Sequence, residues 1–248
     1  MAEPKIEIRG MKDVDLKGGI VLDGFPSIGL ANAIASECLI HSLKTEFVAV
    51  LDSPAFPALS VIRNSAPNFP ARVYANEELK LVFFVSELKL DQSMYRPVAN
   101  TMLQWAADSG CELVISAAGI PYEEGDGPKD DSPQVYAVGS TKKALKRAKD
   151  AGIPTLGSGS VAGIPAILLN EGVLKGLDVI VLLVRVLREA PDFRAGAAVA
   201  EAVSRLVPGA SCDIRSLLKE AEAMEKRLKK IRSEPATGSA ADRQEMYG

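Results

Sequence analysis

Histidine and cysteine are scarce in this 248-residue chain, and both shortages limit the chemistry that it can perform. The one histidine, His41, cannot supply the several histidine ligands of a metallohydrolase and offers a single candidate base for a nucleophile. The three cysteines, Cys38, Cys111 and Cys212, form no CxxC pair, which argues against a zinc site and a disulfide framework. No G-x-S-x-G motif and no partner for His41 is evident, so we predict no enzyme, metal or cofactor.

Long apolar runs and an excess of positive charge are also missing. The longest apolar run, residues 179–184, is far shorter than the about 20 residues that a membrane-spanning helix needs. The first nine residues are rich in charge and contain no apolar segment typical of a signal peptide. With 29 basic and 32 acidic residues the net charge is −3, which disfavours a nucleic-acid partner. We therefore expect a cytoplasmic protein with neither membrane nor nucleic acid among its partners.

Strand-like and helix-like segments alternate along most of the chain. Short apolar runs predict strands at 5–9, 19–25, 45–51, 79–86, 111–117, 153–156 and 179–186, and helical spacing predicts helices at 28–43, 97–110 and 192–206. This alternation is typical of an α/β fold with a mixed, largely parallel sheet flanked by helices. We also expect a hairpin between 59–63 and 72–75, a helix capped by Ser140, and a helix interrupted by Pro165.

The chain changes character after residue 210. Asp213 is a suitable helix N-cap, and acidic residues precede basic ones in the segment that follows, which suits the helix dipole. Apolar residues then recur at alternating spacings of three and four, as in a heptad seam: Ile214, Leu217, Ala221, Met224, Leu228 and Ile231. Such a helix either packs on its own domain or pairs with copies from other subunits. We take the seam as a predicted oligomerisation surface, in a chain divided into 1–210, 211–232 and 233–248.

The last sixteen residues are expected to form a flexible tail that ends in a docking motif. Residues 233–245 contain no bulky apolar side chain and cannot bury enough surface to fold. Met246, Tyr247 and Gly248 then place an apolar side chain, a phenol and a carboxylate at the end of a tether that reaches about 55 Å. A phenol can fill an amphipathic pocket while the carboxylate pairs with a lysine, so this end is a candidate for binding a partner protein.

Two glycine-rich turns are alternative candidate sites. The turn from Gly24 to Gly29 lies between a strand and a helix, where backbone N–H groups can bind an anion, but it lacks the lysine of a Walker A loop. The turn from Gly157 to Gly163 fits G-x-G-x-x-A, yet the acid about 20 residues later, Asp178, precedes a strand instead of following one. Structural turns explain both sequences, and small-ligand binding remains the alternative.

Three stretches of the chain resemble the proteasome assembly chaperone family, in particular the second eukaryotic assembly chaperone and its archaeal homologues. They are GGIVLDGFPSIGLANAIASECLI at 18–40, the loop at 157–163 with PAILLNEG after it, and PDFRAGAAVAEAVSRLVPG at 191–209. The resemblance covers about residues 5–232. It implies a fold similar to nucleoside phosphorylases and hydrolases, assembly into homo-oligomers, and an ATP-independent chaperone or activator.

The C-terminus is similar to the hydrophobic-Tyr-any motif with which proteasome activators dock between α-subunits of the core particle. In this resemblance Met246 is the hydrophobic residue, Tyr247 the tyrosine, and Gly248 the source of the carboxylate that pairs with a pocket lysine. The sequence therefore predicts a homo-oligomeric, ATP-independent proteasome assembly chaperone or activator that binds the α-ring. The alternative is a small-ligand-binding protein or phosphorylase-like enzyme that uses the two glycine turns.

Overall fold

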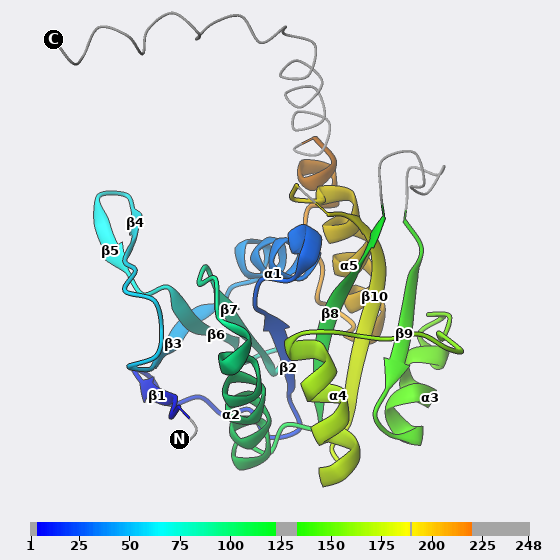
Figure 1. The fold of residues 1–248 in the computed structure, drawn as a ribbon, viewed down its shortest axis with the longest axis horizontal. Coiled ribbons are helices and arrows are strands. Elements are labelled where there is room, and N and C mark those ends of the chain that lie inside the picture. Colours follow the sequence, from blue (N-terminus) through cyan, green and yellow to red (C-terminus); the bar gives the residue numbers. More distant parts are fainter. Residues whose placement is uncertain (1–3, 123–132, 189, 220–248) are drawn as a thin grey trace, which may run out of the picture.

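A mixed eight-stranded sheet with helices on both faces forms the body of the protein (Figure 1). The computed structural model describes residues 4–122, 133–188 and 190–219. In spatial order the strands are β1 (Glu7–Gly10), β3 (Glu46–Asp52), β6 (Ala71–Asn76), β7 (Leu81–Ser86), β2 (Ile20–Gly24), β8 (Leu113–Tyr122), β10 (Val179–Leu187) and β9 (Val135–Gly139). This architecture confirms the predicted α/β class.

The parallel pairings lie in the middle of the sheet. β7, β2, β8 and β10 run parallel to one another, whereas the strands outside them pair antiparallel. β2 and β7 are buried at every position, as expected for parallel strands covered on both faces. Alternate side chains enter two separate cores: Leu22 and Phe83 enter one, and Val21 and Phe84 the other.

The helices divide between the two faces of the sheet. α1 (Ala31–Ser42), α3 (Lys142–Asp150) and α5 (Phe193–Leu206) cover one face, and α2 (Tyr95–Asp108) and α4 (Ile164–Lys175) lie side by side on the other (Figure 1). Short 3₁₀ turns, η1 (Ile28–Leu30) and η2 (Gln92–Met94), precede α1 and α2. Residues 214–219 are helical. Among the helices described, none has both the length and the apolar character to cross a membrane.

The prediction that residues 59–63 pair with residues 72–75 in a hairpin is wrong. β4 (Val61–Arg63) pairs with β5 (Ala66–Asn68), and β6 pairs instead with β3 and β7. The two residues between β4 and β5, Asn64 and Ser65, both have positive φ, at 51° and 61°. This geometry belongs to a tight two-residue hairpin turn, which the sequence carries without the usual glycine.

Helix and strand boundaries between 135 and 165 also differ from expectation. Thr141, not Ser140, caps α3, because its Oγ1 accepts the Ala144 N–H at 3.0 Å. Pro165 lies in the first turn of α4, where a missing N–H costs nothing, and so does not interrupt that helix. The strand expected at 153–156 amounts to one bridge from Thr155, whereas β9 was not expected at all.

Two glycines allow the helices to approach the strands and each other closely. The expected helix at 28–43 is broken at Gly29 (φ 72°) and Leu30 (φ 55°), and α1 begins only at Ala31. A Cβ on Gly29 would lie 2.5 Å from Val186 of β10. A Cβ on Gly196 in α5 would lie 2.5 Å from Ile34 Cγ2 in α1. These contacts fix α1 against both β10 and α5.

We expect Gly196→Val to separate α1 from α5 and to lower the free energy of unfolding by about 1–3 kcal/mol, because overpacking forces neighbouring atoms apart. Urea titration followed by circular dichroism measures this loss. Gly157→Val is the matched control, since no atom lies within 4 Å of its Cβ position. Equal stabilities for the two variants would contradict the tight α1–α5 contact.

Candidate functional site

A large cavity opens beside the carboxyl ends of β2 and β7. Its volume is about 750 Å³. The chain leaves β2 toward α1 on one face and leaves β7 toward α2 on the other, so the two connections diverge at this point. Such divergence points are where open α/β sheets commonly bind ligands. The walls of the cavity are mostly apolar: Phe25, Pro26, Leu30, Ala33, Leu88, Leu90, Tyr95 and Ile164.

An ion-pair network forms the polar side of this cavity. The Glu87 Oε1 atom accepts hydrogen bonds from both Arg63 and Arg72, each at 2.7 Å. Glu37 of α1 lies 3.5 Å from Arg63 and 3.7 Å from Arg72. Arg72 is only 2% exposed and also donates to the Phe69 carbonyl at 2.7 Å, so its charge is compensated inside the protein. The two acids and two arginines largely neutralise one another.

His41 has an acidic neighbour that the sequence did not indicate. Its Nε2 atom lies 3.5 Å from Glu37 Oε2, one turn earlier on α1. The side chain is 73% exposed, and Glu37 is already shared with two arginines. The arrangement is an exposed contact between a histidine and a carboxylate that two arginines already share.

A buried carboxylate, Asp23, lies at the end of β2. It is 1% exposed and accepts hydrogen bonds from Ser116 Oγ at 2.6 Å and from the Phe25 N–H at 2.9 Å. Burial raises the pKa of Asp23 to about 6, although these hydrogen bonds favour its ionised form. Asp23 is the one charged residue in the apolar run at 19–25, so the sequence did mark this position. The sequence did not indicate that Ser116 of β8 is its hydrogen-bond partner.

The two glycine turns differ in how closely they are packed. A Cβ on Gly24 would lie 2.7 Å from Ser36 Oγ, and Gly29 is packed against Val186, so both glycines serve close packing. Residues 157–160 are exposed, and Gly163 caps α4. Asp178 precedes β10 and is bonded to Thr141 and Lys143. None of this geometry favours a phosphate or dinucleotide site at either turn.

No metal-binding group is found in the described part of the chain. Across residues 4–122, 133–188 and 190–219, no cluster of three or more histidine, cysteine or acidic side chains has a geometry that would hold an ion.

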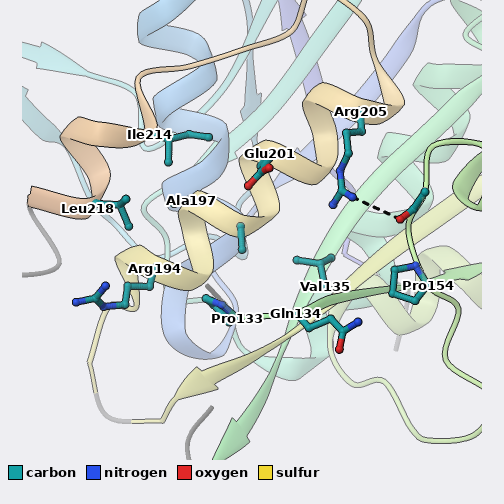
Figure 2. Close-up of a pocket in the computed structure, with 12 residues that line it drawn as sticks. Pro133, Gln134, Val135, Pro154, Arg194, Ala197, Glu201, Arg205, Ile214 and Leu218 are labelled. Carbon is teal, nitrogen blue, oxygen red and sulfur yellow. Dashed lines mark hydrogen bonds between the residues drawn. The ribbon is translucent and has the colours of Figure 1, made fainter. Parts of the chain in front are cut away.

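The first turn of the C-terminal helix contacts its own domain. Ile214 and Leu218 line a cavity of about 260 Å³ beside α5, where Figure 2 shows both side chains near Arg194 and Ala197. Leu217 lines a separate groove of about 420 Å³ against α1. Asp213 is the predicted N-cap, because its Oδ1 accepts the N–H groups of Arg215 and Ser216.

The remaining predicted site residues lie outside the described residues. They are Ala221, Met224, Leu228 and Ile231 of the seam and Met246, Tyr247 and Gly248 of the docking motif. Of the seam, Ile214 and Leu217 are described, and both are half-buried on their own domain. The seam and the motif therefore stay predictions.

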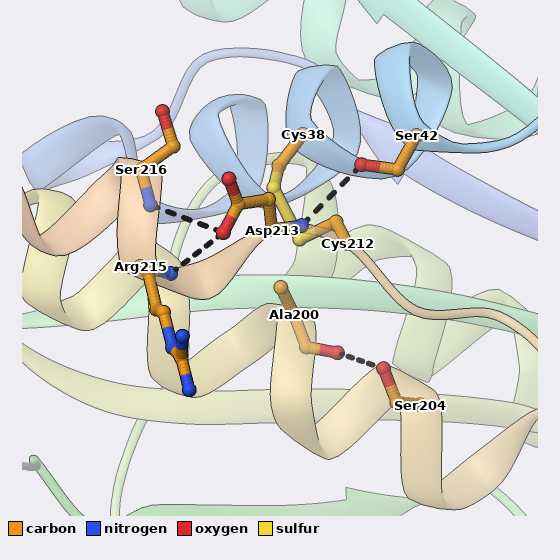
Figure 3. Close-up of a disulfide and its surroundings, with 8 residues drawn as sticks. All are labelled: Cys38, Ser42, Ala200, Ser204, Cys212, Asp213, Arg215 and Ser216. Carbon is orange, nitrogen blue, oxygen red and sulfur yellow. Dashed lines mark hydrogen bonds between the residues drawn. A yellow bond between two sulfur atoms is a disulfide. The ribbon is translucent and has the colours of Figure 1, made fainter.

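The cysteine spacing disfavours a disulfide framework, but the structure contains one disulfide. Cys38 of α1 and Cys212 are bonded, with their Cα atoms 5.6 Å apart (Figure 3). The two residues are 174 positions apart, and only the packing of α1 beside α5 brings them together. Cys111 is a free thiol, and burial raises its pKa to about 11.

Comparison with known proteins agrees with the predicted family. The model of the PAC2 family matches residues 21–232. The structure is similar to Pyrococcus furiosus PbaA, an archaeal homolog of proteasome-assembly chaperone, with 27% identity, 91% of each chain covered and a TM-score of 0.79. It is also similar to Pyrococcus furiosus PbaB, an archaeal proteasome activator, with 26% identity, 92% of this chain and 99% of that chain covered and a TM-score of 0.79.

A sequence relative extends the match. An uncharacterized protein of Methanocaldococcus jannaschii is 25% identical over 218 residues, which cover 88% of this chain and 87% of that protein. The chain belongs to the PAC2 family. The fold similarity covers both faces of the sheet and is not confined to one motif.

Replacing Asp23 tests the buried carboxylate. An aspartate ionises near pH 3.8 in the unfolded chain and near 6 in the folded protein, so the folded state binds more protons in between. Stability from this group therefore falls as the pH rises from about 4 to about 6. We expect wild type to lose about 2–3 kcal/mol relative to Asp23→Asn between pH 4 and pH 7, measured by urea denaturation.

The control is Asp13→Asn, which removes an exposed carboxylate. Its stability should follow that of the wild type across the same pH range. A constant difference between wild type and Asp23→Asn would contradict the raised pKa.

Proposed function

We propose that the protein is a homo-oligomeric, ATP-independent assembly chaperone or activator of the proteasome, which docks Met246, Tyr247 and Gly248 into α-ring pockets of the core particle. The observation that carries the proposal is the similarity to PbaA and PbaB over nine tenths of the chain. The hydrophobic-Tyr-any sequence at the C-terminus supports the specific mode of docking. The partners are then α-subunits and further copies of this chain.

In this proposal each of the three parts of the chain has its own role. Residues 1–210 form the α/β body, 211–232 the terminal helix, and 233–248 a tether that carries the motif. A single short peptide binds weakly, but several tethers on one oligomer bind the same ring together. The second binding event then takes place at an effective concentration of about 1 mM, and avidity gains roughly 10²–10⁴-fold when the geometry permits.

The ion-pair network and the glycine turns support a binding role over a catalytic one. Glu37, Glu87, Arg63 and Arg72 are engaged with one another, and the glycines at 24 and 29 are needed for packing. The body thus serves as a scaffold that presents the terminal helix and the tether.

Removing the docking motif tests the proposal directly. We expect deletion of Tyr247 and Gly248 to reduce co-purification with core particles at least about 100-fold, because each tether loses its anchor and the avidity is lost with it. Native mass spectrometry should find the fold and the oligomer unchanged. Gln244→Ala, which alters the tether but keeps the motif, is the control and should bind like wild type. Undiminished binding by the truncated chain would contradict docking through the tail.

Charging the heptad seam tests the oligomer. We expect Leu228→Glu to lower the oligomeric state, because a buried seam position would have to desolvate a carboxylate. Ala223→Glu adds the same charge off the seam and should leave the assembly intact. Sedimentation or native mass spectrometry measures both. An unchanged mass for Leu228→Glu would show that the seam does not join the subunits.

One observation favours a second function, the binding of a small ligand. The 750 Å³ cavity lies where the connections after β2 and β7 diverge, and its walls are apolar with a polar side. A thermal-shift titration with nucleosides, nucleotides and phosphate discriminates between the two functions. Saturable stabilisation that is lost when Tyr95 is replaced by alanine would favour the ligand site, whereas no shift would favour the scaffold.

A further inference from the structure

We propose that Cys38 and Cys212 form a reversible thiol–disulfide site that holds the first turn of the C-terminal helix on α1 when oxidised and releases it when reduced. We call the Cys38–Cys212 bond and the helical turn that it holds the clamp. The clamp follows from the fold of the chain alone. Its effect on partner binding rests on the function proposed above.

The disulfide is placed at the base of the segment that carries the seam and the tail. Cys38 lies in the second half of α1, and Cys212 lies two residues after Ala210, which is fully buried, and two before Ile214 (Figure 3). The bond therefore joins the body of the protein to the start of the terminal helix. It acts on the position of that helix more than on the core.

The contacts recorded for this segment among the described residues are weak. The Asp213 N–H donates to Ser42 Oγ at a long 3.4 Å. The Asp213 carboxylate bonds N–H groups of its own helix, so it does not tie the helix to the body. Ile214, Leu217 and Leu218 are only half-buried. When the disulfide is reduced, only these of the described contacts hold the first turn on the body, so we expect the turn to become more mobile.

The disulfide is open to attack from solvent. Both cysteines are half-buried, and Cys38 lines the groove of about 420 Å³ between α1, Phe193 and Leu217. A small thiol can approach the sulfur atoms along this groove. Cys111 differs, because burial raises its pKa to about 11 and leaves almost no thiolate at neutral pH. Cys111 therefore serves as an unreactive control cysteine in the same chain.

The chemistry is thiol–disulfide exchange with a small-molecule disulfide as oxidant. The thiolate of one cysteine attacks the small disulfide, forming a mixed disulfide and releasing one small thiol. The thiolate of the other cysteine then attacks the mixed disulfide at the protein sulfur, and the second small thiol leaves. The two protein thiols are oxidised by two electrons, the small disulfide is reduced to two thiols, and the two protons leave with them. An excess of the small thiol drives the reverse reaction through the same mixed disulfide.

The clamp controls the direction in which the terminal helix leaves the body. In the bonded state the first turn is held between α1 and α5, so every subunit presents its helix at the same angle. In the reduced state residues 211–213 become a hinge. Preorganised tethers bind a symmetric ring with less loss of conformational entropy than tethers on a hinge, so reduction should weaken binding.

The first experiment tests the clamp without any partner. Full-length wild type is equilibrated with either oxidised or reduced glutathione, and hydrogen exchange of residues 211–219 is followed by mass spectrometry. We expect exchange to become at least about tenfold faster on reduction, as local opening becomes easier. Cys38→Ser and Cys212→Ser should exchange fast in both conditions, and Cys111→Ser should behave like wild type.

Alkylation before and after reduction counts the thiols in parallel. We expect Cys38 and Cys212 to be labelled only after reduction. Labelling of both cysteines after equilibration with oxidised glutathione, or equal exchange rates in the two states, would overturn the clamp.

The second experiment measures binding to core particles in the two redox states. We expect reduced wild type and Cys38→Ser to bind about tenfold more weakly than oxidised wild type and Cys111→Ser. Equal binding, with exchange still sensitive to reduction, would overturn the regulatory effect and leave the clamp standing. If exchange responds to reduction but neither state binds core particles, the function proposed above fails together with this regulatory effect, whereas the clamp is supported.

Discussion

The burial of four parallel strands between two apolar layers determines the rest of the structure. β7, β2, β8 and β10 have few polar side chains on either face, so helices must cover both faces to remove them from water. α1 and α5 share one face, and Gly196 lets them approach until Ile34 fills the space of a missing side chain. This close approach brings Cys212, which follows α5, to Cys38 of α1. The disulfide is therefore a result of how the sheet is covered.

Elements with a strong local pattern were predictable, although the cap at Thr141, the break at Gly29 and the β4–β5 hairpin were missed despite being local. Features that depend on distant pairing were not predictable. The apolar runs of β2, β7 and β10 and the N-cap Asp213 are visible in the sequence, because each is defined within a few residues. The pairing of β6 with β3, the short strand β9 and the disulfide depend on segments brought together by folding. The same holds for the candidate site. The sequence presents Met246 and Tyr247 as an isolated apolar end, whereas Arg72 and Glu87 meet only through the sheet.

The body of the protein combines features of a scaffold with one feature of a ligand-binding fold. Its acids and arginines around Glu87 are paired with one another, and the glycines at 24 and 29 are packed against neighbouring side chains. The cavity between the loops after β2 and β7 is the exception, since it lies where related sheet topologies hold small molecules. The chain belongs to the PAC2 family and is similar to PbaA, an archaeal homolog of proteasome-assembly chaperone, and to PbaB, an archaeal proteasome activator.

The covalent bond between α1 and the segment after α5 also has a mechanical consequence. With the sulfur atoms joined, residues 38–212 form a closed covalent ring, and the chain outside it continues from two adjacent points. A force applied to the chain after Cys212 passes through the sulfur bridge to Cys38. The α5 helix and the strands inside the ring bear none of this load along the backbone. Most of the sheet lies inside the ring and stays unloaded along the backbone, while the tension continues into the part of the chain that precedes Cys38.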